Sequence, residues 1–161
     1  MRPIARLDVE LRASALLALS IAAAGLFGAF GRGADPARAI VGFAVAAILI
    51  GIVSHVGTRF LRTGERFPRV ADGVLIEHPA QTMRRTIVGM VLPMLVVIVL
   101  LAVSGGTGAV FGGVLAGIGI IDLANLAVLR RRQAAGREVV FRELGGSPFA
   151  GGRRPIYTRP T

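Results

Sequence analysis

The sequence predicts an all-α fold: an integral membrane four-helix bundle made of two transmembrane hairpins, with cytoplasmic N and C termini. Three observations carry this prediction. The 161-residue chain is 53% hydrophobic and only 17% charged, with a mean hydropathy of +0.68. Its apolar residues form long charge-free runs, and its arginines gather at particular ends of those runs. Soluble domains carry about a quarter charged residues, so this composition is typical of a membrane-embedded chain.

The charge-free runs are 13–31, 39–58 and 86–121, which hold 19, 20 and 36 residues. A helix needs about 20 apolar residues to cross a bilayer core, so the first two runs fit one crossing each. The third run is too long for one crossing, and it contains the turn-forming sequence Ser-Gly-Gly-Thr-Gly at 104–108. The first run is longer than the hydrophobic part of a usual signal peptide and is expected to be retained. We therefore expect spans near 13–31, 39–58, 86–103 and 108–129, within a transmembrane domain of residues 1–129.

Arginine placement predicts the orientation, because basic residues near span ends stay on the cytoplasmic side. All 19 basic residues are arginine; 3 precede the first span, 6 lie in the loop 59–85 and 8 lie in the tail 130–161. Only 2 lie in the first outer loop. Both termini and the loop 59–85 are therefore expected at the cytoplasmic face of the cell inner (plasma) membrane, in a multi-pass protein.

The segments outside the spans are predicted less sharply. In the loop 59–85, the mixture of Phe67, Val74 and Ile76 with prolines favours a short interfacial helix or a small hairpin against the headgroups. The basic cytoplasmic tail 130–161 keeps a helix-compatible pattern through Glu143. It is expected to be flexible after about residue 145, where proline, glycine and arginine dominate, with 155–157 as a docking point for a partner.

Composition excludes several function classes. The chain has no cysteine and no lysine, which rules out disulfides, thiolate nucleophiles, Schiff bases and a P-loop lysine. It also lacks HExxH, GxSxG and aspartate-rich magnesium motifs, so we expect no enzyme, no metal and no cofactor. The net charge of +10 follows from the arginine topology. With no tryptophan and a single tyrosine for stacking, anionic lipid headgroups are favoured as partners over nucleic acid.

Asp122 is the one acidic residue in a span, and an intramembrane carboxylate indicates a functional site by default. It lies about 12 Å along the helix from Arg130, or about 6 Å from water if the span ends near Leu126. We expect His55, Asp122 and Asn125 to form an intramembrane polar cluster. This cluster would be either a proton or cation site or a polar clamp joining the hairpins. The clamp is favoured, because transport sites normally need more than one carboxylate and a water path.

Other residues carry structural predictions. Overlapping GxxxG spacings predict close helix packing, within one chain rather than between copies, at Gly108, Gly112, Gly113 and Gly117. Pro93 lies inside the third span and predicts a kink. Contacts with lipid headgroups or a partner are expected at Arg130, Arg131 and Arg132.

By elimination, these features favour a non-enzymatic accessory, assembly or scaffold subunit of a membrane complex. The layout resembles ATP synthase protein I, a family of four-span assembly factors with cytoplasmic ends. The resemblance covers one helix in four and rests on 108–132, where a glycine-rich span ends in Asn125 and then Arg130, Arg131 and Arg132.

Two alternative functions stay open. One is a small proton- or cation-handling transporter or channel-like oligomer that uses Asp122 and His55, and the other is a holin-like protein. The expected partners are the lipid bilayer with its anionic headgroups and other membrane protein subunits. A homo-oligomer also stays open.

Overall fold

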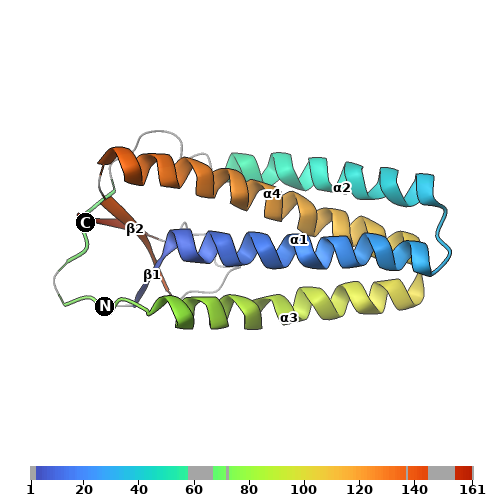
Figure 1. Cartoon of the computed structure of the whole chain (residues 1–161), viewed down its shortest axis with the longest axis horizontal. Helices are drawn as coiled ribbons and strands as arrows, with labels where there is room; N and C mark the ends of the chain where they lie inside the picture. Colours follow the sequence, from blue (N-terminus) through green and yellow to red (C-terminus); the bar gives the residue numbers. More distant parts are fainter. Residues whose placement is uncertain (1–2, 58–66, 72, 137, 145–154, 161) are drawn as a thin grey trace.

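The computed structural model describes residues 3–57, 67–71, 73–136, 138–144 and 155–160. This part of the chain holds four helices and three short strands (Figure 1). All four helices are long and apolar enough to cross a membrane, which confirms the prediction of a mostly helical chain with four apolar spans. The strands correct the all-α class, because they form a small sheet. The elements are β1 (Ile4–Arg6), α1 (Leu7–Gly31), α2 (Pro36–Gly57), α3 (Pro79–Val103), α4 (Gly105–Gly136), β2 (Glu138–Glu143) and β3 (Ile156–Pro160).

Three helices extend beyond their apolar runs at the arginine-rich end. The first turn of α1 carries Asp8 and Glu10, whose carboxylates complement the positive end of the helix dipole. At the start of α3, the His78 side chain accepts a hydrogen bond from the Ala80 N–H at 3.3 Å, and Pro79 occupies the first helical position. At its other end, α4 continues to Gly136. These polar turns lie outside the predicted spans and lengthen them.

The turn between α3 and α4 is tighter than predicted. Only Ser104 separates the two helices, and its backbone is extended at φ −160°. The Ser104 carbonyl accepts a hydrogen bond from the Gly108 N–H at 3.1 Å. A Cβ on Gly105 would lie 3.0 Å from the Ala29 carbonyl oxygen. The glycine-rich sequence therefore brings α4 close to the end of α1 while remaining helical itself.

The helices lie in a row whose two edges are α2 and α3, and α4 crosses this row obliquely, from beside α2 to behind α1 and the end of α3 (Figure 1). The central helix α4 packs on both α1 and α2, while α3 packs on α1 and α4. As a result, α2 and α3 lie at opposite edges and expose most of their apolar side chains. Exposed large residues include Val41, Ile48 and Val53 on α2 and Val88, Leu92 and Val99 on α3.

Two glycines of α4 allow its backbone to contact the backbone of α2 directly. A Cβ on Gly113 would lie 2.2 Å from the Phe43 carbonyl oxygen, and one on Gly117 would lie 2.5 Å from the Ala47 carbonyl oxygen. Real Cβ atoms do not approach so closely, so any side chain here would push the helices apart. The spacing of four residues is thus repeated on both helices of the contact.

The other two glycines of the predicted packing set face different neighbours. A Cβ on Gly112 would lie 3.0 Å from the Ala22 carbonyl oxygen of α1. A Cβ on Gly108 would lie 2.4 Å from the Leu101 side chain of α3. All four glycines therefore lie at contacts between helices of the same chain.

Arg32 joins the two hairpins at the end of the bundle opposite the strands. It follows the last residue of α1, and its guanidinium donates to the carbonyl oxygens of Leu101 at 3.2 Å and Ala102 at 3.0 Å. These carbonyls belong to the last turn of α3, where backbone acceptors lack helical partners. Arg32, which belongs to the first hairpin, therefore supplies hydrogen-bond donors to the free carbonyls at the C-terminus of α3.

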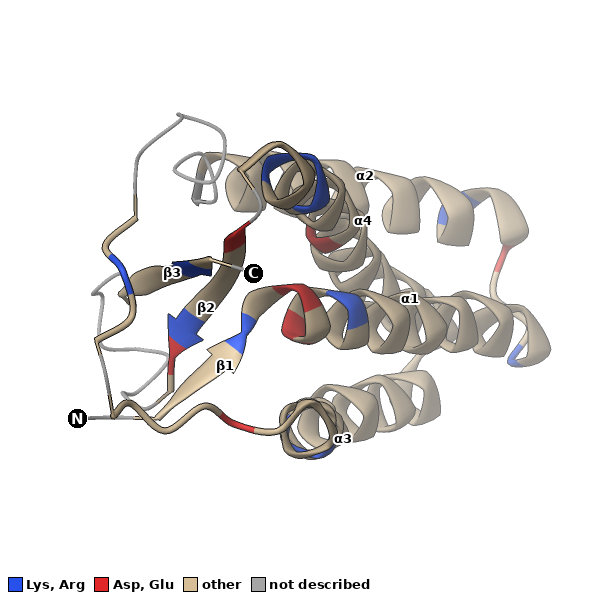
Figure 2. Ribbon diagram, turned by 60° about the vertical axis from the view of Figure 1, so that its left-hand side comes forward, with Lys and Arg blue, Asp and Glu red and all other residues tan. Residues whose placement is uncertain are grey.

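The three strands form an antiparallel sheet in the order β1-β2-β3. Ile4 pairs with Glu143 between β1 and β2, and Val140 pairs with Thr158 between β2 and β3. Figure 2 shows the sheet across one end of the helix row, beside the start of α1. The N-terminal and C-terminal strands therefore lie at the same end, as the arginine distribution predicts for the two termini.

Residues of the middle loop flank both edges of this sheet. On the β1 edge, the Ile4 N–H donates to the Leu75 carbonyl at 2.9 Å, and the Glu77 N–H donates to the Ile4 carbonyl at 2.8 Å. On the β3 edge, the Val70 N–H and the Thr158 carbonyl lie 2.9 Å apart in a hydrogen bond. We call β1, β2, β3 and residues 67–71 and 74–77 the cap.

The cap corrects three expectations. The helix predicted through Glu143 ends at Gly136, because 138–143 (Glu-Val-Val-Phe-Arg-Glu) is rich in β-branched and aromatic residues and finds strands on both sides. Within the tail expected to be flexible, 156–160 is held as β3, while 145–154 and 161 lie outside the described residues. In the loop predicted at 59–85, residues 67–71 and 74–77 are extended edge segments in place of an interfacial helix, and 79–85 are the first turns of α3; 58–66 and 72 lie outside the description.

An apolar cluster fastens the cap to the helices. It combines two residues of α1, two of α4 and two of the sheet, and Phe67 of the middle loop packs against it. Leu129 is only 1% exposed, although it lies at the end of the predicted span. The cap and the helix row therefore share one core, made of Leu7, Leu11, Leu126, Leu129, Val140 and Ile156.

We predict that Gly113→Ala destabilises the protein, because the added methyl would meet the Phe43 carbonyl oxygen. Overpacking of this kind costs about 1–3 kcal/mol. Gly89→Ala is the matched control, since nothing lies within 4 Å of a Cβ at that position of α3. Thermal unfolding in detergent, followed by circular dichroism, should show a lower midpoint for Gly113→Ala only. Equal midpoints for the two variants would contradict the close α2–α4 contact.

We also predict that Ile4→Cys combined with Glu143→Cys forms a disulfide in this cysteine-free chain. The Ile4 backbone groups bond to the other edge, so its pairing with Glu143 is of the non-hydrogen-bonded kind. Such pairs have Cα atoms about 4.5 Å apart, within the range of disulfides. Ile4→Cys with Tyr157→Cys is the control, because β2 separates these strands. Mass spectrometry of oxidised membranes should find the first linked peptide and not the second; the reverse result would refute the strand order.

Candidate functional site

The predicted intramembrane carboxylate, Asp122, forms a hydrogen bond with α1. The Ser14 hydroxyl donates to Asp122 Oδ2 at 2.6 Å. Ser14 follows Arg12 by two residues, which is about 3 Å of helix rise. Asp122 is thus level with the second residue of the first predicted span. This bond joins the first hairpin to the second.

A network of ion pairs lies beside this bond, where the helices meet the cap. Arg142 of β2 pairs with Glu10 of α1, and Arg85 of α3 lies 3.9 Å from the same carboxylate oxygen. Arg85 also lies 3.5 Å from Glu77, which accepts a hydrogen bond from the Thr82 hydroxyl at 2.7 Å. The network therefore ties two helices, β2 and the middle loop together.

The network is only partly exposed to solvent. The side chains of Glu10 and Glu77 are each 15% exposed, and those of Arg85 and Arg142 are 37% and 31% exposed. Removing one member of a partly buried pair leaves the other charge desolvated without its partner, which is more costly than losing a surface pair. Arg142 and Glu10 also interact electrostatically with Asp122. Figure 2 shows acidic and basic residues close together at the first turns of α1 and along β1 and β2.

The three residues of the predicted polar cluster lie on α2 and α4, and their mutual contact stays a prediction. Asn125 is fully buried at 0% exposure. Asp122 faces Ser14 on α1, whereas His55 lies on α2 and lines a shallow apolar hollow with Ile121 of α4. The described hydrogen-bond partner of Asp122 is Ser14, a residue that the predicted cluster did not include.

The remaining predicted residues lie as follows. Pro93 is inside α3, which continues past it to Val103. Arg130 and Arg131 are exposed near the end of α4. Arg132 is half-buried, and its guanidinium carbon lies 5.1 Å from the centre of the Phe67 ring, a cation–π geometry.

Two further polar contacts hold the edges of the cap. The Tyr157 hydroxyl donates to Glu143 Oε2 at 3.3 Å, and desolvation together with this carboxylate raises the pKa of Tyr157. Arg6 donates two hydrogen bonds to Asp8, at 3.1 and 2.8 Å, and this partner raises the pKa of Arg6. Both groups keep their ordinary neutral-pH protonation states.

Sequence reasoning missed the ion-pair network because its members lie far apart in the chain. Arg142 and Glu10 are 132 residues apart, and nothing in the local pattern of either residue indicates the other. One signal was present: Glu10 and Arg85 each lie within three residues of a predicted span, where charged groups are partly withdrawn from water.

Among the described residues, no group of three or more His, Asp or Glu side chains is placed to hold a metal ion. No protein-family model matches the chain, and no curated protein or solved structure matches it either. Fold and site together define a class, a multi-pass protein by the length and composition of its four helices, with a small sheet attached to one end of the helix row.

We predict that Ser14→Ala lowers the free energy of unfolding by about 0.5–1.5 kcal/mol, because it removes the donor to Asp122. Asp122→Asn keeps an acceptor oxygen and should change stability and assembly little. Unfolding by SDS titration, followed by circular dichroism, measures both. If Asp122→Asn were the more damaging variant, the negative charge rather than the hydrogen bond would be required.

Proposed function

We propose that this protein is a non-enzymatic accessory, assembly or scaffold subunit of a complex in the cell inner (plasma) membrane. The observation that carries the proposal is the internal pairing of its charged groups. Asp122 accepts from Ser14, and the network of Glu10, Arg142 and Arg85 holds helices and cap as one body. Groups committed to each other in this way favour a structural role over a transport path.

The helix row supports the same proposal through its edges. Val53 on α2 is 67% exposed and Leu92 on α3 is 69% exposed, on opposite sides of the row. Inside a bilayer, lipid covers such faces as well as a protein does, and helices associate wherever close packing is available. Two apolar edges without a neighbouring helix offer lateral surface for a partner on both sides of the protein.

The transporter alternative would use Asp122 and His55. The hollow beside His55 is lined by Ile48, Ile52, Val56 and other apolar residues, which suits lipid better than a hydrated ion. Because of this apolar lining, the transporter alternative is less favoured than the accessory-subunit proposal. The holin-like alternative stays third, and lysis of the host upon expression would be its sign.

The experiment is site-specific photo-crosslinking in native membranes. A photoreactive amino acid is placed at Val53 in one variant and at Leu92 in another, two positions of matched exposure on opposite edges. A subunit that docks through one edge should give a discrete, stoichiometric protein adduct from one position, and the same protein should copurify in mild detergent. Adducts with lipid only, together with Asp122-dependent cation flux in proteoliposomes, would replace the proposal by the transporter alternative.

A further inference from the structure

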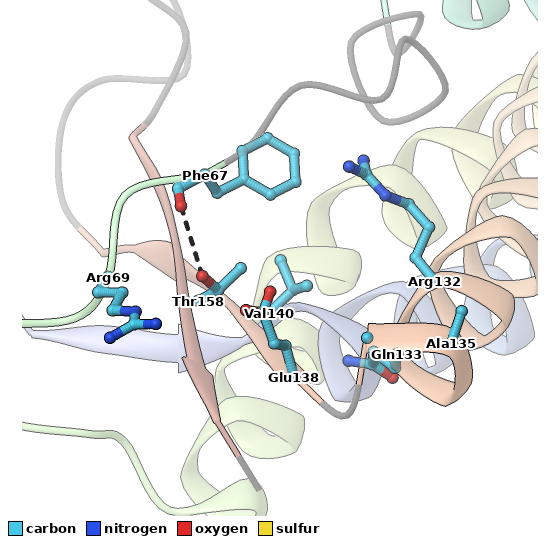
Figure 3. Close-up of a pocket in the computed structure, with 9 residues that line it drawn as sticks. Phe67, Arg69, Arg132, Gln133, Ala135, Glu138, Val140 and Thr158 are labelled. Carbon is cyan, nitrogen blue, oxygen red and sulfur yellow. Dashed lines mark hydrogen bonds between the residues drawn. The ribbon is translucent and has the colours of Figure 1, made fainter.

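A pocket of about 540 Å³ opens where α4 meets the cap (Figure 3). The last turn of α4 forms one wall, β2 and β3 form the floor, and the middle-loop residues from Phe67 to Arg69 form the opposite wall. Figure 3 shows Arg132 on one side and Arg69 on the other, with Phe67, Thr158 and Val140 between them. The described lining residues are Phe67, Arg69, Arg132, Gln133, Ala135, Gly136, Glu138, Val140 and Thr158.

The polar groups of this pocket are mostly hydrogen-bond donors. Arg69 and Arg132 contribute two guanidinium groups, against a single carboxylate from Glu138 among the described lining residues. The Gln133 Nε2 is buried and has no hydrogen-bond partner within the described part of the chain. The Thr158 hydroxyl donates a long hydrogen bond of 3.4 Å to the Phe67 carbonyl oxygen. A buried donor without an acceptor is costly, so this wall favours an anion.

The Phe67 ring fixes one of the two cations. Its contact with Arg132 holds the guanidinium at the mouth of the pocket instead of leaving it to extend into solvent. Phe67 also packs against the apolar cluster shared by cap and helices, so it is itself anchored. A guanidinium positioned in advance loses less side-chain entropy when it binds a phosphate, whose oxygens match its donors.

The depth of the pocket indicates where such an anion comes from. Residues 132–136 follow Leu129, the end of the predicted span, by 3 to 7 residues, or about 5 to 10 Å of helix. The headgroup layer of a bilayer is roughly 5 to 8 Å thick on each side of the hydrocarbon core. With the span ending at Leu129 as predicted, the pocket lies at the level of the lipid phosphates.

We infer that this pocket binds the phosphate of an anionic lipid headgroup between Arg69 and Arg132, with Gln133 as an additional donor. The apolar part of the lining, Phe67 and Val140, would contact the glycerol of the same lipid. Bound there, one lipid would contact α4, the sheet and the middle loop at once. A soluble phosphate has the same chemistry and is the second source that the experiment separates.

The test titrates the full-length protein in a mild detergent with phosphatidylglycerol or phosphatidylcholine and counts bound lipid by native mass spectrometry. Arg132→Gln should weaken phosphatidylglycerol binding by about tenfold, as expected for one lost charge-assisted hydrogen bond. Arg84→Gln is the matched control, because it removes an equal charge from an exposed position of α3 at the same end of the helices, outside the pocket lining. This control should change the affinity for phosphatidylglycerol by less than about twofold, because long-range electrostatic attraction to an exposed charge is screened by salt.

Arg69→Gln keeps the inference falsifiable if Arg132→Gln perturbs folding, since Arg69 is exposed and lies in an edge segment. Its loss should also weaken phosphatidylglycerol binding, with the unfolding midpoint unchanged. Inorganic phosphate is titrated in parallel; competition with the lipid at millimolar concentration or below would assign the site to soluble phosphate. Equal effects of the Arg69, Arg84 and Arg132 variants, or equal binding of the two lipids, would overturn the inference.

Discussion

Close backbone contact between α4 and its two neighbours is the constraint on which the rest of the structure depends. Lipid supplies no hydrophobic force that would press helices together, so close packing at small residues has to do so. Gly113 and Gly117 leave room for α2, and Gly112 leaves room for α1. With both sides of α4 occupied, α2 and α3 lie at the edges of a row, and the long C-terminal end of α4 delivers β2 to the first strand of the chain.

The cap follows from this arrangement and from the chemistry of the membrane boundary. Strands with unpaired backbone groups are not tolerated in hydrocarbon, so the three short strands can pair only outside it. Both sheet edges are covered by the middle loop, which leaves few backbone groups open for pairing with another chain. Because β1 pairs with β2, the cap can form only after α4 has been made and inserted. Arg142 and Glu10 then join its last and first parts across the end of the row.

The spans were predictable because the length of an apolar run is a local property that can be read directly from consecutive residues. The common end of the termini was also predictable, since the arginine asymmetry is a property of composition around each span. The sheet was not, because 138–143 is helix-compatible by pattern and becomes a strand only beside partners more than a hundred positions distant in β1. Asp122 stood out as a rare charge, but its partner Ser14 is a common residue in an apolar helix and carries no signal of its own.

The central claim is that four helices cross a membrane and hold the cap on its inner side. Labelling of single cysteines in spheroplasts with a membrane-impermeant maleimide tests it most directly. Ser104→Cys lies in the exposed turn between α3 and α4, and Arg159→Cys replaces an exposed residue of β3. The account predicts labelling of Ser104→Cys in intact spheroplasts and of Arg159→Cys only after permeabilisation. Labelling of Arg159→Cys before permeabilisation would contradict it.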